Sequence, residues 1–174
     1  MAPPMTKHIT KPIRAIHFLV LAFLMTLSSP IVAQDFQKGL AAFQAGDYAT
    51  ALQEWTPLAE AGLAQAQTSL GFMYNNGNGV LQDYKEAVKW YRLAAEQGTA
   101  SAQTNLGFMY EKGQGVLQDN ATAHMWYNVG AANGNELGGT NRDNLASKMT
   151  PAAIEKAQAM ARECMNSGYT KCGY

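Results

Sequence analysis

Apolar side chains recur along residues 65–98 at the spacing of two amphipathic helices. A first helix is predicted because Ala66, Leu70, Met73 and Tyr74 stand at positions i, i+4, i+7 and i+8 of one stripe. A second helix follows, and its predicted apolar face consists of Tyr84, Ala87, Val88, Tyr91, Ala94 and Ala95. The segment is therefore expected to form a helical hairpin.

The segment between the two helices carries the signals that separate them. Gly77 and Gly79 interrupt the first pattern, and their expected role is a turn with positive φ. Val80 and Leu81 supply a hydrophobic lead into the second helix, which Asp83 is predicted to cap. Gly98 is expected to end that helix.

The same pattern returns 36 residues later. Between residues 65–98 and 101–134, nineteen of the 34 aligned positions are identical. A single hairpin cannot bury both of its apolar faces, so adjacent repeats are expected to stack and share a core.

These residues resemble a known family of helical repeats. The pattern LGxMYxxGxGVxQDxxxAxxWYxxAAxxG is similar to the bacterial Sel-one-like repeat (SLR), a relative of the tetratricopeptide repeat. Residues 36–62 have a shorter inter-helix loop and resemble the tetratricopeptide pattern itself, whereas 136–174 read as degenerate capping helices and a tail. Thr150 is predicted to cap the last helix, with Pro151 at its first position. The resemblance implies an all-α fold: a right-handed α/α superhelical solenoid of helical hairpins with a C-terminal capping helix pair.

The first 33 residues have the pattern of an export signal. Lys7, Lys11 and Arg14 precede the apolar run from Phe18 to Leu27, and small residues follow up to Ala33. The run spans about 15 Å as a helix, half of a bilayer core, so no permanent membrane span is expected after signal removal. Cleavage after Ala33 is predicted, although a retained N-terminal anchor stays open as the alternative. The protein is therefore expected to be periplasmic or secreted.

The charge and cysteine content are compatible with an exported protein that does not bind nucleic acid. From residue 34 onward the chain carries 10 basic and 13 acidic residues, so no basic patch favours nucleic-acid binding. Cys164 and Cys172 are eight residues apart with Gly168 between them, which favours a structural disulfide that ties down the tail in an oxidising compartment. A redox role is the weaker interpretation, because seven residues separate the pair.

Candidate catalytic groups each have a structural interpretation. His124 is the one histidine after residue 33 and occupies the repeat position of Val88, which favours packing over metal binding or catalysis. Asp83 and Asp119 are predicted to be helix caps rather than paired catalytic carboxylates. Trp90 and Trp126 are predicted to lie in the core. No catalytic residue, metal site or cofactor is predicted, so the chain is expected not to be an enzyme.

A stripe opposite the core of the first helices is the candidate binding surface. It consists of Gln65, Ser69, Phe72, Asn76, Ser101, Asn105, Phe108 and Lys112. First helices line the concave side of such superhelices, so Phe72 and Phe108 would offer aromatic anchors amid polar groups. The alternative is that both rings pack between neighbouring helices.

The resemblance then implies a non-catalytic adaptor of the bacterial cell envelope that binds another protein or a peptide segment on this concave face. Two alternatives remain open. Cysteine-rich SLR relatives suggest β-lactam binding or weak hydrolysis, although the disulfide in each of their repeats is missing here. Glycan binding by an envelope scaffold is the other. The sequence leaves the partner and the oligomeric state open.

Overall fold

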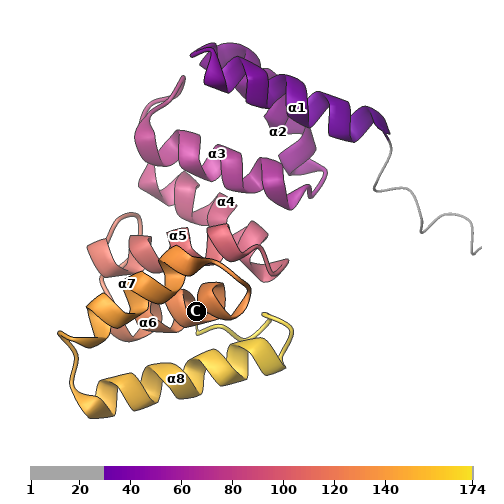
Figure 1. The fold of residues 1–174 in the computed structure, drawn as a ribbon. Helices are drawn as coiled ribbons and strands as arrows, with labels where there is room; N and C mark the ends of the chain where they lie inside the picture. Colours follow the sequence, from indigo (N-terminus) through magenta and orange to yellow (C-terminus); the bar gives the residue numbers. More distant parts are fainter. Residues whose placement is uncertain (1–29, 174) are drawn as a thin grey trace, which may run out of the picture.

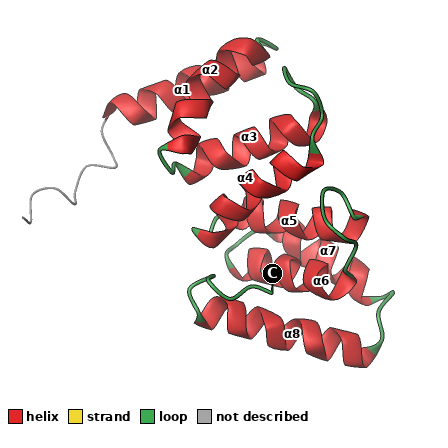
Figure 2. Ribbon diagram, turned by 180° about the vertical axis from the view of Figure 1, so that it is seen from behind, coloured by secondary structure: helices red, strands yellow, loops and turns green. Residues whose placement is uncertain are grey.

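The computed structural model describes residues 30–173, in which all regular structure is helical (Figures 1 and 2). The helices are α1 (Pro30–Gln44), α2 (Tyr48–Glu60), α3 (Ala64–Asn76), α4 (Tyr84–Glu96), α5 (Ala100–Lys112), α6 (Asn120–Ala132), α7 (Glu136–Ala146) and α8 (Pro151–Asn166). The predicted export signal lies outside the described residues except for its last four, which begin α1. Among the described helices, none is both long and apolar enough to cross a membrane.

The first six helices pack as three hairpins, and α7 and α8 both pack on α6, so that the helices stack along one axis from α1 to α8 (Figure 1). Within the hairpins, α1 packs on α2, α3 on α4, and α5 on α6. Between them, α2 contacts α3, α4 contacts α5, and α6 contacts both α7 and α8. The predicted all-α repeat solenoid is therefore confirmed.

The predicted helix caps are confirmed in the structure. Asp83 accepts hydrogen bonds from the backbone N–H groups of Lys85 and Glu86, and Asp119 does the same for Ala121 and Thr122. Thr150 caps α8, with Pro151 in the first turn. Side-chain capping satisfies N–H groups that have no partner within the helix, so α4, α6 and α8 each begin at a defined residue.

In each of the first three hairpins, one aromatic side chain of the core packs against a glycine of the preceding helix. Tyr91 and Tyr127 are buried, and a Cβ on Gly71 would lie 2.6 Å from the Tyr91 ring, while one on Gly107 would lie 2.7 Å from the Tyr127 ring. Trp55 occupies the same place over Gly39. Trp126 is fully buried and Trp90 nearly so, which confirms their predicted core role.

A row of side-chain amides connects the hairpins, and we call it the amide ladder (Gln67, Gln97, Gln103 and Asn133). Gln67 and Gln103 are buried and donate to the carbonyl oxygens of Ala59 and Ala95, each at 3.0 Å. Their own amide oxygens accept from Gln97 and Asn133, each at 2.8 Å. The bonds to Ala59 and Ala95 cross to the preceding hairpin, whereas the amide–amide bonds join the two helices of one hairpin. Together they connect successive repeats through side chains at equivalent positions.

The C-terminal tail closes the far end of the ladder. Cys164 and Cys172 form the predicted disulfide, and both are buried. The loop between them presents Tyr169, whose hydroxyl donates to Asn133 Oδ1 at 3.0 Å. Gly139 of α7 stands at the repeat position of Gln103 and has no side-chain amide, so the ladder ends at the hydrogen bond from Tyr169 to Asn133.

The inter-helix loops differ from the predicted hydrophobic lead. Val80 and Val116 are half-buried, but Leu81 and Leu117 are 91% and 90% exposed. Gln82 donates to the carbonyl of Asn75, and Gln118 to that of Glu111, each at 2.8 Å. With these bonds holding the loop against the preceding helix, the leucine between the valine and the glutamine faces solvent.

Candidate functional site

The candidate binding stripe lies on α3 and α5, the first helices of the second and third hairpins. Phe72 is 44% exposed and Phe108 is 39% exposed. Around them, Ser69 and Asn105 are half-buried, whereas the remaining stripe residues Gln65, Asn76, Ser101 and Lys112 are exposed. The two phenylalanines therefore present large apolar surfaces to solvent.

Part of this stripe borders a hollow of about 230 Å³, which we call the aromatic hollow. Its lining comes from four helices: Leu40 and Phe43 of α1, Trp55 of α2, Thr68, Ser69 and Phe72 of α3, and Asn105 of α5. The structure thus brings Ser69, Phe72 and Asn105 of the predicted stripe together. The other predicted residues, Gln65, Asn76, Ser101, Phe108 and Lys112, do not line the hollow.

Aromatic rings form one wall of the hollow. The Phe43 ring centroid lies 5.6 Å from that of Trp55 and 5.9 Å from that of Phe72, the latter edge-on. Phe36 also stacks on Trp55, with ring centroids 5.7 Å apart, and its carbonyl accepts the Trp55 indole hydrogen bond at 3.1 Å. These contacts hold the wall in a defined geometry, as aromatic pairs at such distances do.

Phe108 has a different setting one repeat further along. The Lys112 ammonium lies 5.6 Å from its ring centroid and pairs with Glu111 at 2.8 Å. Burial would raise the pKa of Glu111, but hydrogen bonds from Lys112 and from the Tyr127 hydroxyl outweigh it, so the pKa is lowered. Glu111 is therefore held as a carboxylate that orients Lys112 along Phe108.

The sequence analysis did not predict four residues of the hollow as site residues: Leu40, Phe43, Trp55 and Thr68. Aligning the chain at a constant offset of 36 hides Leu40, since the first inter-helix loop is shorter. Aligning Gly39 with Gly71 and Gly107 instead places Leu40 at the position of Phe72 and Phe108. In each hairpin this glycine packs against the aromatic ring of the second helix. Its position is therefore the sequence signal that could have identified Leu40 as a site residue.

The residues considered for chemistry are structural in the described chain. His124 is 2% exposed, and burial together with the positive charge of Arg142 lowers the pKa of its imidazole. Asp83 and Asp119 are caps, as described above. Within residues 30–173 no three side chains of histidine, cysteine, aspartate or glutamate gather as metal ligands would.

Stacked helical hairpins with a shared core define a protein of the helical-repeat solenoid class. Comparison with family models finds the Sel1 repeat at residues 64–99 and 100–135. A solved structure of a Sel1 repeat protein from Oxalobacter formigenes is 35% identical, with a TM-score of 0.59, and the match covers 65% of this chain and 88% of that one. The chain belongs to the Sel1 repeat family.

A second solved structure shares more of the fold. It is c5321, a protective antigen present in uropathogenic Escherichia coli strains that displays an SLR fold. The match has a TM-score of 0.75 and 27% identity and covers 79% of this chain, but only 31% of the length of c5321. No curated protein matches the chain in sequence. Sel1-repeat solenoids generally serve as scaffolds for protein–protein interactions and are typically non-catalytic.

Proposed function

We propose that the protein is a non-catalytic adaptor of the bacterial cell envelope, and that a partner protein or peptide segment docks on the face formed by α1, α3 and α5. This face contains the stripe on α3 and α5 for which the sequence analysis expects a position on the concave side. The partner would contact Phe72 and Phe108 directly, with the polar side chains of the stripe on either side. Docking requires no chemical step.

The observation that carries this proposal is the exposure of Phe72 and Phe108. They stand at equivalent positions of two repeats, on helices in which Leu70 and Leu106 are at most 1% exposed. Exposed aromatic rings on a rigid scaffold provide contact area at low entropic cost, which is why they are frequent at interface centres.

Three features support a location in the envelope. The pattern of residues 1–33 favours export, with cleavage after Ala33. The buried Cys164–Cys172 disulfide is typical of proteins that fold in an oxidising compartment. The similar protein c5321 is described as a protective antigen, which is compatible with an exported protein.

The test is cross-linked capture of partners from envelope extract, using protein expressed from the full sequence. The protein should capture a small set of partners that the Phe72→Ala/Phe108→Ala variant loses. Leu81→Ala/Leu117→Ala is the matched control, because it also removes two exposed apolar side chains from equivalent positions of the two repeats.

Each outcome bears on one part of the proposal. Loss of capture in the leucine variant alone would move the docking face to the loops. If both variants capture the same partners as the wild-type protein, neither the two phenylalanines nor the two leucines take part in docking. Hydrolysis of a chromogenic β-lactam by the purified protein would contradict the non-catalytic assignment.

A further inference from the structure

We propose that the aromatic hollow is an anchor pocket that binds one bulky, uncharged apolar side chain, preferably aromatic, from an extended partner peptide. This inference rests on the proposed function, since it names the chemistry of the partner that docks on the face of α1, α3 and α5. It adds three wall residues from the first hairpin, Leu40, Phe43 and Trp55, that the stripe does not contain.

The size of the hollow suits a single ring. A cavity of about 150 Å³ with apolar walls is known to bind benzene in another protein. The hollow has about 230 Å³, so it has room for a phenol or indole group together with its methylene link. It is too small to enclose a folded element, which leaves one side chain as the natural occupant.

The walls of the hollow are preformed. The Trp55 ring is held by its hydrogen bond to the carbonyl of Phe36 and by its close packing over Gly39, where a Cβ would lie 2.4 Å from the indole nitrogen. Phe43 is in turn held between Trp55 and Phe72. A preformed pocket avoids much of the entropic cost of ordering side chains on binding.

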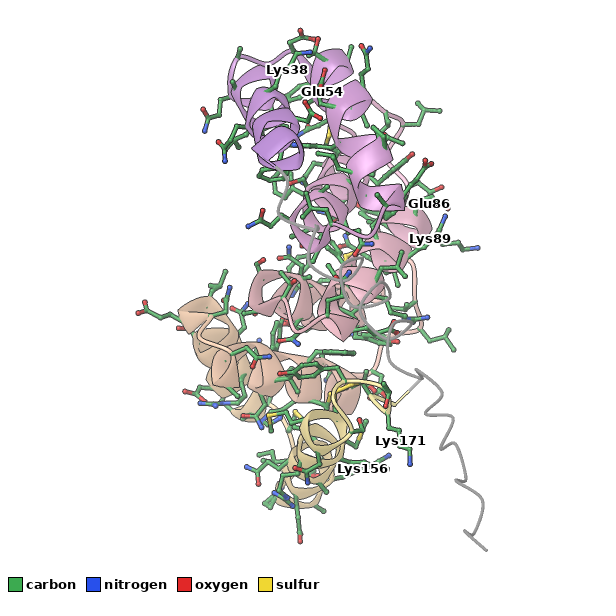
Figure 3. The ribbon with its side chains drawn as sticks, turned by 90° about the vertical axis from the view of Figure 1, so that its right-hand side faces the viewer. Lys38, Glu54, Glu86, Lys89, Lys156 and Lys171 are labelled. Atoms are coloured by element: carbon green, nitrogen blue, oxygen red, sulfur yellow. A yellow bond between two sulfur atoms is a disulfide. The ribbon has the colours of Figure 1, made fainter. Side chains whose placement is uncertain are left out.

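The charge pattern selects an uncharged occupant. None of the seven lining residues is ionisable. The charged neighbours of the wall along the chain, Lys38 beside Gly39 and Glu54 beside Trp55, pair with each other across α1 and α2 (Figure 3). A lysine or glutamate entering the hollow would lose hydration without gaining a partner of opposite charge, and that exchange is unfavourable.

Two polar side chains at the hollow are available to form hydrogen bonds with a ligand. The Ser69 hydroxyl and the Asn105 amide line the hollow, are half-buried, and make no hydrogen bond within the described residues. An extended peptide exposes backbone N–H and C=O groups on either side of its anchor side chain, and these groups need partners when they leave water. Ser69 and Asn105 can supply both a donor and an acceptor.

The experiment selects random peptides displayed on phage against the purified protein and measures the affinity of the enriched peptides for designed variants. Ser69→Leu fills the hollow from α3. Ser101→Leu is the matched control, because it makes the same substitution on the same stripe, outside the hollow. Asn105→Leu fills the hollow from α5 and replaces the first variant if that one melts early.

The expected result is enrichment of peptides with a tryptophan, phenylalanine, tyrosine or leucine in an uncharged stretch. Their affinity should fall by roughly 30-fold in Ser69→Leu, as for loss of a central hot spot, and stay unchanged in Ser101→Leu. Enriched peptides that keep their affinity for both filled-hollow variants, but lose it for Phe72→Ala/Phe108→Ala, would overturn the anchor pocket and leave the adaptor function standing. Affinity unaffected by any of these variants, or no enrichment, would overturn both.

Discussion

Gly71 and Gly107 show how a single residue type makes the stacking of this solenoid possible. Each lies in the middle of a first helix, where glycine costs up to about 1 kcal/mol relative to alanine. The structure shows the compensation, because the ring of Tyr91 or Tyr127 occupies the space that a Cβ would need. The glycine therefore lowers the helix propensity, but it allows the two helices of a hairpin to pack closely.

Gly71→Ala is expected to destabilise the protein by about 1–3 kcal/mol, since the added Cβ must displace the buried Tyr91 ring. The measurement is the free energy of unfolding by denaturant titration. Gly139→Ala in α7 is the control, because its nearest neighbour would be 3.8 Å away, an ordinary contact. That variant should be neutral or more stable by up to about 1 kcal/mol, and equal losses in the two variants would contradict the packing argument.

Individual residues were predictable from the sequence to different degrees. The capping roles of Asp83, Asp119 and Thr150 follow from local spacing, and the structure confirms them. The exposure of Phe72 did not follow, because a phenylalanine at that position could equally pack between helices. Burial depends on what lies opposite a side chain in space, which spacing along one helix does not specify.

At the scale of elements, α6 differs from its repeat equivalent α4 in one buried polar group. His124 of α6 stands at the position of Val88, and both are buried. Within residues 30–173 no group forms a hydrogen bond with His124 Nδ1, and the charged groups acting on the ring are Arg142 and Asp143 of α7. Burial and Arg142 lower the pKa of the imidazole more than Asp143 raises it.

The stability of the protein should therefore fall as the pH drops below about 6.5, the ordinary histidine value. In that range the unfolded chain takes up a proton at His124 that the folded chain does not, which favours unfolding by up to about 1.4 kcal/mol per pH unit until the folded pKa is reached. His124→Val, which copies Val88, should reduce this loss. The measurement is the Tm of both proteins at about pH 7.5 and about pH 5.5.

That pH interval lies above the ordinary pKa of carboxyl groups, so the caps contribute little to the comparison. An identical change in Tm for the wild-type protein and for His124→Val would show that the imidazole is protonated as readily in the folded state as in the unfolded one.

At the scale of the whole molecule, the disulfide and the N-terminus can be tested by one measurement. Protein recovered from the periplasm of an expressing bacterium should have the mass of residues 34–174 less two hydrogens. The mass should rise by two hydrogens on reduction, because Cys164 and Cys172 form one disulfide. The mass of the full sequence would show a retained signal, and a mass unchanged by reduction would contradict the disulfide.

The helical hairpins, their caps, their repeat and the pairing of the two cysteines can all be predicted from the order of the residues alone. Each of these depends on residues close together in the chain or on a constant period of 36, so the signal is local and is repeated. For the same reason the stacked solenoid could be predicted, because a hairpin with two apolar faces requires neighbours.

The position of the aromatic hollow and the residues that line it depend on how the helices pack in three dimensions. Its walls come from α1, α2, α3 and α5, so Leu40 and Asn105 line the same hollow although they are 65 positions apart in the chain. The amide ladder likewise joins Gln67 to Gln97 and Gln103 to Asn133, which no helical period relates. A pocket depends on the distance and angle between packed helices, and these follow from the side chains of all of them together rather than from any one segment.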